Sequence, residues 1–237
     1  AIVDPALVLT VPGFVAADTG MDVLTHATEA YVSQMASDYT DGLALQAIKL
    51  VFENLESSVK NADFHSREKM HNASTIAGMA FANAFLGISH SMAHKIGAQF
   101  HTIHGRTNAI LLPYVIRYNG TRPAKTATWP KYNYYRADEK YQDIARMLGL
   151  PASTPEEGVA SYAKAVYELG ERVGIEMNFK AQGVDEKEWK EHSRELAFLA
   201  YEDQCSPANP RLPMVDHMQE IIEDAYYGYK ERPGRLK

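Results

Sequence analysis

The stretch GMDVLTHATEAY, residues 20–31, decides the interpretation of this chain. Its apolar residues recur at the intervals of an α-helix. Asp22 and His26 stand four residues apart within it. Residues at that spacing on a helix point from the same face, with their Cβ atoms about 5–6 Å apart. The stretch therefore predicts a helix that presents a carboxylate and an imidazole side by side.

A second stretch, HSMAH at residues 90–94, repeats this spacing with two histidines, and His104 follows in the next segment. Two helices of this kind can direct their paired side chains to one point, where His104 would join them. A carboxylate together with imidazoles favours zinc or iron over calcium or magnesium. The spacing therefore predicts a transition-metal site.

The distribution of histidines separates a metal site from ordinary core residues. A single buried histidine is usually hydrogen-bonded within the core, but five of the nine histidines are His26 and those between residues 90 and 104. The H-x-x-x-H spacing lacks the glutamate of the zinc proteases, which argues against peptide hydrolysis. For His101 both a supporting role and plain exposure stay open, and Cys205 is predicted to be a packed thiol.

The remaining sequence predicts an all-α helical bundle that forms a single domain over residues 1–237. Two prolines and a cluster of aromatic residues predict a loop at residues 119–137. Ala1–Leu9 contains β-branched residues broken by a proline, and it predicts a short strand-like arm. Capping residues mark the starts of three further helices at Ser37, Thr154 and Asp185.

The composition of the chain argues against several classes of function. The chain has 237 residues, of which 46% are hydrophobic and 23% charged, as is typical of a globular protein. Its net charge of −6 argues against a surface for nucleic acid or for anionic membranes. No apolar run is long enough for a membrane span. Because the chain has one cysteine, it has no intrachain disulfide, and a cytoplasmic location is expected.

Residues 20–31 resemble the signature of the iron-dependent (group III) alcohol dehydrogenases. The stretch GISHSMAHKIGA at 87–98, continuing through His104 to NAILLP at 108–113, resembles the second signature of that family, and NPR at 209–211 also matches. The insertion at 121–137, with GAQFH at 97–101, most resembles the C-terminal alcohol dehydrogenase half of bifunctional aldehyde–alcohol dehydrogenases. The match runs from end to end.

The resemblance implies roles for individual residues. Asp22, His26, His90 and His104 occupy the four metal-ligand positions, and His94 occupies the position of a catalytic histidine that lies near the substrate and the nicotinamide without binding metal. The implied fold is the α-helical, metal-binding domain of the dehydroquinate-synthase-like architecture. The implied cofactors are Fe²⁺, with Zn²⁺ as an alternative that the same donors accept, and NAD(H) in the full-length enzyme.

The implied activity is the interconversion of short primary alcohols, such as ethanol, and aldehydes by hydride transfer. The expected partners are the alcohol or aldehyde, the NAD domain of the same polypeptide and further copies in a homo-oligomer. The nucleotide-binding domain of the family precedes this region, and no glycine-rich phosphate loop occurs here. The isolated chain is therefore expected to bind NAD weakly and to be inactive. Two alternatives remain, namely a helical assembly module with a structural metal, and a polyol dehydrogenase or lyase of the same fold.

Overall fold

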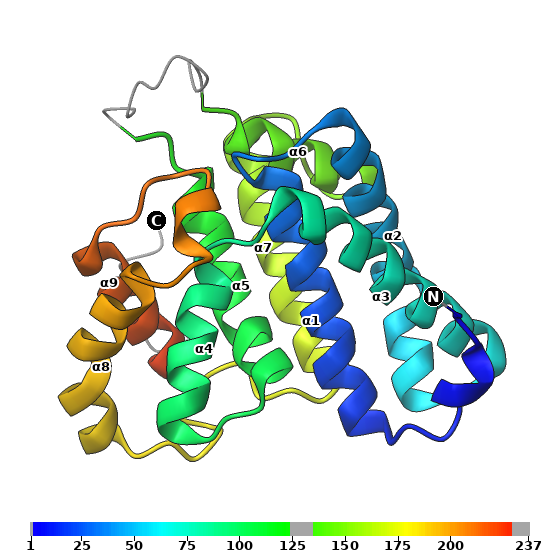
Figure 1. Cartoon of the computed structure of the whole chain (residues 1–237), viewed down its shortest axis with the longest axis horizontal. Coiled ribbons are helices and arrows are strands. Elements are labelled where there is room, and N and C mark those ends of the chain that lie inside the picture. Colours follow the sequence, from blue (N-terminus) through cyan, green and yellow to red (C-terminus); the bar gives the residue numbers. More distant parts are fainter. Residues whose placement is uncertain (1, 124–134, 229–237) are drawn as a thin grey trace.

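The computed structural model describes residues 2–123 and 135–228, and within these ranges the regular structure is helical, with no β-strand (Figure 1). The helices follow in the order η1 (Pro5–Val8), α1 (Gly13–Val32), α2 (Asp38–Lys60), α3 (Phe64–Ala84), α4 (Ile88–Phe100), α5 (His104–Gly120), α6 (Ala137–Met147), α7 (Pro155–Arg172), α8 (Glu186–Tyr201), η2 (Ser206–Ala208) and α9 (Val215–Tyr227). The predicted all-α bundle is confirmed.

Helix α5 separates two hydrophobic clusters. Ala109, Leu112 and Ile116 contribute to the larger cluster, which also contains residues of α1, α2, α3, α6 and α7. Ile110 and Leu111 contribute to the smaller cluster, together with residues of α4, α8 and α9. A helix that is apolar around its whole circumference can pack on both sides. Figure 1 accordingly shows α4, α8 and α9 on one side of α5 and α1, α2 and α3 on the other.

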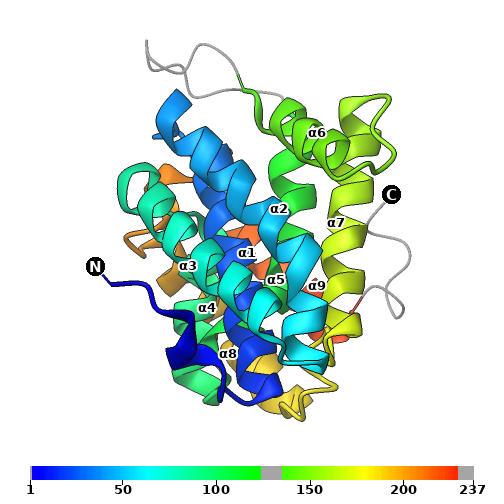
Figure 2. The same ribbon diagram turned by 90° about the vertical axis from the view of Figure 1, so that its right-hand side faces the viewer.

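Helix α1 is buried along most of its length because α2 and α3 cover one side of it and α5 packs on another (Figure 2). At Gly20 the packing is so close that an added Cβ would lie 2.2 Å from Leu55 Cδ1. The polar residues Asp18 and Glu29 of α1 are nevertheless buried. They contact the first turns of α5 and α4, respectively, and so help to build the site.

A sharp bend joins α3 to α4. The backbone of Phe85 lies in the left-handed region, with a φ of 62°, and the two helices make an angle of 106°. Among the described residues, no single helix is long and apolar enough to cross a membrane. By length and composition, α3 and α4 meet that criterion only as a pair joined across this bend.

The predicted strand-like arm at Ala1–Leu9 is not confirmed. Pro5–Val8 form a 3₁₀ helix, and the carboxylate of Asp4 caps it by accepting a backbone N–H at 2.9 Å. Aspartate before proline is a helix-start signal, since proline at the first helical position needs no N–H partner. This local signal prevails over the β-branched residues, because the described residues offer the arm no strand to pair with.

The predicted helix starts are confirmed. Ser37, Thr154 and Asp185 cap α2, α7 and α8, and each side chain accepts a backbone N–H of the first turn. The predicted loop at 119–137 begins later than expected, because α5 continues to Gly120. Residues 124–134 of this loop lie outside the described residues.

Candidate metal centre

Three of the predicted ligands converge where α1, α4 and α5 meet. Asp22 Oδ1 lies 3.7 Å from His90 Nε2 and 3.6 Å from His104 Nε2. Ligand atoms held at about 2.1 Å around one tetrahedral ion lie about 3.4 Å apart. The observed separations are therefore close to those that a single transition-metal ion requires.

The buried side of this group contains an acceptor without a partner. His90 is 1% exposed, and its Nε2 makes no hydrogen bond within the part of the chain that the structure describes. Its other ring nitrogen, Nδ1, donates to Glu29 Oε2 at 2.6 Å, so Nε2 keeps a lone pair. An unpaired buried acceptor costs about 1–3 kcal/mol. A cation between Nε2 and Asp22 would remove that cost, so the residues present fit a metal ion.

Glu29 fixes the orientation and the tautomer of His90. The buried carboxylate of Glu29 accepts hydrogen bonds from Gly87 N at 3.0 Å and Ser89 N at 2.7 Å, in addition to His90 Nδ1. The amides at the start of α4 thus bind a carboxylate from α1, as helix N-termini favour. Together with Asp22, Glu29 gives the site two carboxylates, whose charge a divalent cation would balance.

Asn108 on α5 connects two of the converging side chains. Its Nδ2 donates to Asp22 Oδ1 at 2.8 Å and lies 3.1 Å from His104 Nε2. Its Oδ1 in turn accepts from Ser89 Oγ at 3.3 Å. Asn108 therefore links the carboxylate of α1 to the imidazole at the start of α5.

His26, the fourth predicted ligand, lies beside this group. Its ring stacks on Phe81 and on His90, with ring centroids 4.5 Å apart in both pairs, and its Nδ1 is 4.0 Å from Asp22 Oδ2. Burial and the neighbouring His90 lower the pKa of His26 to about 4. Burial likewise lowers the pKa of His104. Both imidazoles are therefore neutral at pH 7, which is the form that binds metal; the assignment of His26 as a ligand stays a prediction.

The first turn of α5 is held tightly against α1. At Gly105 an added Cβ would lie 2.2 Å from Asp18 O and 3.1 Å from Asp22 Cβ. Arg106 donates from Nε and Nη2 to the two carboxylate oxygens of Asp18, at 2.9 and 3.0 Å. These contacts fix His104, the first residue of α5, opposite Asp22.

Gly105→Ala is expected to lower the free energy of unfolding by about 1–3 kcal/mol and to weaken metal binding, because the added methyl group forces α5 away from α1. Gly78→Ala is the matched control. At Gly78 in α3 an added Cβ meets nothing within 4 Å, and alanine is favoured in a helix by about 1 kcal/mol. Denaturant unfolding and metal titration measure both effects. Equal stability of the two variants would contradict the close approach.

His94, the predicted catalytic residue, lies at the edge of the cluster. Its ring stacks on His104 with centroids 5.5 Å apart, and its centroid is 6.2 Å from that of His90. Its Nδ1 is 3.2 Å from Asp203 Oδ2. Cys205 is buried, as predicted for a packed thiol. The structure thus places His94 beside the ligands, and its catalytic role stays a prediction.

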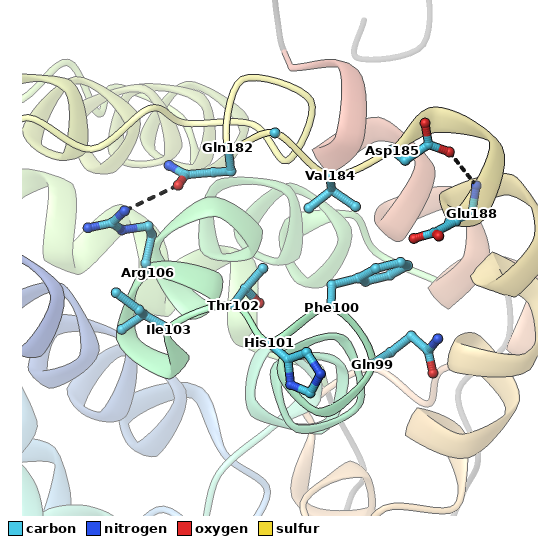
Figure 3. Close-up of a pocket in the computed structure, with 11 residues that line it drawn as sticks. Gln99, Phe100, His101, Thr102, Ile103, Arg106, Gln182, Val184, Asp185 and Glu188 are labelled. Atoms are coloured by element: carbon cyan, nitrogen blue, oxygen red, sulfur yellow. Dashed lines mark hydrogen bonds between the residues drawn. The ribbon is translucent and has the colours of Figure 1, made fainter.

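A separate cavity of about 500 Å³ lies at the end of α4 (Figure 3). His101, Phe100, Arg106 and Gln182 are among the residues that line it, and Arg106 Nη1 donates to Gln182 Oε1 at 3.2 Å. His101 ends α4 with a left-handed backbone, at a φ of 54°. Because His101 faces this cavity and is absent from the converging group, it is not a candidate ligand.

Three residues that support the site were missed by sequence reasoning. Glu29 lies seven residues after Asp22, on the same face of α1, and Asn108 lies four residues after His104 on α5. Helical spacing could have identified both. Asp203 is 109 residues from His94, and no spacing rule connects them.

Comparison with known proteins agrees with this geometry. The family model described as the Fe-containing alcohol dehydrogenase family, C-terminal, matches residues 16–226. The chain is 97% identical over 237 residues to the aldehyde-alcohol dehydrogenase of Streptococcus pneumoniae serotype 2 (strain D39), covering 100% of this chain and 27% of that protein. It is 43% identical over 235 residues to the bifunctional aldehyde-alcohol dehydrogenase of Escherichia coli K12. That match covers 96% of this chain and 26% of the E. coli protein.

Among solved structures, the iron-containing alcohol dehydrogenase of Thermococcus thioreducens matches with a TM-score of 0.82 at 35% identity, covering 96% of this chain and 55% of that one. The matches to the two bacterial aldehyde-alcohol dehydrogenases show that this chain spans about a quarter of the length of those proteins. The chain belongs to the Fe-containing alcohol dehydrogenase family, and it matches the C-terminal part of that family. The resemblance drawn from residues 20–31 and 87–98 is confirmed.

Proposed function

We propose that this chain is the metal-binding half of an NAD-dependent alcohol dehydrogenase that interconverts short primary alcohols, such as ethanol, and aldehydes. The observation that carries the proposal is the convergence of Asp22, His90 and His104, with the buried Nε2 of His90 unpartnered among the described residues. Membership of the Fe-containing alcohol dehydrogenase family and the near identity to an aldehyde-alcohol dehydrogenase support the reaction class.

Asp22, His26, His90 and His104 are the residues that would hold the ion. The family points to Fe²⁺, and one carboxylate with three imidazoles also accommodates Zn²⁺. When bound, a divalent ion supplies the positive charge that lowers the pKa of an alcohol hydroxyl and polarises an aldehyde carbonyl.

The side chains around the ligands orient the reactants and move the proton. Phe81, stacked on His26, gives the site an apolar wall. The His94 side chain is 34% exposed, and we propose that its Nε2 accepts the hydroxyl proton and returns it to solvent. Glu29 keeps the proton of His90 on Nδ1, so that the Nε2 lone pair stays directed toward Asp22.

NAD(H) supplies the hydride chemistry, and we propose that a separate domain of the same polypeptide binds it. The two aldehyde-alcohol dehydrogenases that match this chain extend far beyond the matched part, which supports this division. The single-domain organisation of residues 1–237, a homo-oligomer and a cytoplasmic location stay predictions; a single, buried Cys205 is compatible with the last of these.

The exposure of the site favours catalysis over a purely structural metal. Structural metal sites are closed, whereas catalytic sites keep a position open to solvent or substrate. The His104 side chain is 44% exposed and lies next to the partly exposed His94, so the cluster opens to solvent on this side. This observation supports the proposal over the helical assembly module.

The test uses the full-length protein. Chelation is expected to abolish NAD-linked ethanol oxidation while the helical circular dichroism signal is retained, and Fe²⁺ is expected to restore the activity. In a cobalt-substituted sample, azide is expected to shift the visible absorption, because an open coordination position accepts it. Loss of helical structure together with the metal, and no azide response, would favour the structural module. A higher kcat/KM for glycerol than for ethanol would favour a polyol dehydrogenase.

A further inference from the structure

Asp203, in the turn that follows α8, is a largely buried carboxylate with three partners. Its Oδ2 lies 2.8 Å from Lys95 Nζ and 3.2 Å from His94 Nδ1. Its Oδ1 accepts the backbone N–H of Cys205 at 3.0 Å. Asp203 is 8% exposed, so the carboxylate itself is largely shielded from solvent. Lys95 and His94 are neighbours on α4, and the contacts of α4 with α8 bring them to Asp203.

A second metal site is one reading of this cluster, since ligand atoms of His94, Asp203 and Cys205 lie within 4.8 Å of one another. Lys95 argues against it, because its ammonium group already neutralises the carboxylate that a cation would need. Burial and the nearby Asp203 raise the pKa of the Cys205 thiol to about 12, so the thiolate that binds metal is not present near pH 7. The carboxylate therefore has another role.

We propose that Asp203 is a positioning residue that holds His94 as the Nδ1–H tautomer, with the lone pair of Nε2 available to the substrate. A carboxylate can only accept, so the proton of a neutral His94 ring must be on Nδ1 when that nitrogen faces Asp203. Nε2 makes no hydrogen bond within the described residues, and the ring is held against His104 at the edge of the ligand cluster. The proposal rests on the proposed alcohol dehydrogenase function.

Lys95 compensates the negative charge of the largely buried Asp203 carboxylate. Partial burial works to raise the pKa of Asp203, but hydrogen bonds from Lys95, from the Cys205 N–H and from His94 outweigh it and lower the pKa. The carboxylate is therefore ionised and paired, and it orients His94 without leaving an uncompensated charge beside the site. An orienting partner of this kind fixes which ring nitrogen is free to accept a proton.

The test is a double-mutant cycle in the full-length, iron-loaded protein. Asp203→Asn keeps the shape and the acceptor for the Cys205 N–H, but it replaces the second oxygen with an amide that donates to His94 Nδ1 and so favours the wrong tautomer. We expect kcat to fall about 10–100-fold, with KM changed by less than about 3-fold and metal content unchanged. In a His94→Ala background, Asp203→Asn is expected to have almost no further effect, because Asp203 acts through His94.

Asp41→Asn is the matched control. Asp41 also pairs with a lysine at 2.8 Å, that of Lys140, but the pair joins α2 to α6, away from the ligand cluster. This variant loses the same kind of ion pair and is expected to keep its kcat. As an activity-independent readout, acylation of His94 by diethyl pyrocarbonate, measured by peptide mass spectrometry, is expected to be slower in Asp203→Asn, since the reagent attacks an unprotonated ring nitrogen.

The outcomes are distinct. If His94→Ala lowers kcat but Asp203→Asn does not, the positioning role is wrong and the proposed function stands. If the two losses multiply in the double variant, Asp203 acts by another route, which also overturns the proposal. If the parent protein lacks alcohol dehydrogenase activity, the proposed function fails, and unchanged acylation of His94 in Asp203→Asn would then separately overturn the tautomer assignment.

Discussion

Asp22→Asn is expected to remove most of the bound metal and, with it, the stability that the metal contributes. Asp22 Oδ1 lies 3.7 Å from His90 Nε2 and 3.6 Å from His104 Nε2, so the change replaces the charged ligand that lies between the two imidazoles. An ion present at 100 times its dissociation constant stabilises the folded state by about 2.7 kcal/mol. Elemental analysis and thermal unfolding, each with and without a chelator, measure the two effects together.

Asp63→Ala separates this effect from a general loss of stability. Asp63 caps α3 by accepting Ser66 N at 2.9 Å, and loss of such a cap costs about 1 kcal/mol whether or not metal is present. In Asp22→Asn, by contrast, the chelator is expected to make no further difference to stability. His104→Ala is expected to behave as Asp22→Asn does. Full metal occupancy in both ligand variants would show that the ligand assignment is wrong.

The helices could be predicted from sequence because their signals are local. The caps at Ser37, Thr154 and Asp185 depend on a side chain and an amide a few residues away, and these predictions are confirmed. The prediction of a strand-like arm at Ala1–Leu9 was wrong, because β-branched residues form a strand only where a partner strand exists. There, the local Asp4-Pro5 signal determined the structure instead.

The candidate site could be predicted only in part, because sequence spacing reports local structure and the site is built by contacts between helices. Spacing places two side chains on one face of one helix, as with Asp22 and His26, but it does not show that two helices converge. The same rule places Glu29 on the face of Asp22, but the role of Glu29 depends on the amides and the imidazole of α4, which spacing along α1 does not predict. Asp203 contacts His94 solely because α8 packs on α4, so no local pattern identifies it.

The location of the site predicts that metal binding and stability are coupled. Asp22 lies on α1, which packs in the larger hydrophobic cluster, and His90 lies on α4, which packs in the smaller one. His104 begins α5, the helix that contributes to both clusters. An ion bound by all three side chains would connect the two clusters at their junction, in addition to the apolar contacts along α5. Loss of a ligand is therefore expected to lower the stability of both clusters and not only of the helix that carries the ligand.

His94→Ala is expected to lower kcat of the full-length enzyme about 10²–10⁴-fold and to leave the metal content unchanged. His94 is one turn beyond His90 on α4, and its ring stacks on His104, so it lies next to the ligands. Its Nδ1 faces Asp203, so Nε2 is the nitrogen that the proposed proton transfer would use. Four other residues are assigned to the metal, so loss of this imidazole removes a proton acceptor and no ligand.

Measuring metal content and kcat on the same preparation distinguishes the roles open to His94. Retained metal together with a large fall in kcat supports the proton-transfer role, because removal of a metal ligand would also lower the metal content. Loss of metal would make His94 a ligand and would require one of the four assigned residues to be reassigned. Unchanged kcat would make it a bystander. His65→Ala, at an exposed histidine in the first turn of α3, is the control. It is expected to alter neither quantity, since His65 lies at the opposite end of α3 from Phe81, the residue of that helix that stacks on His26.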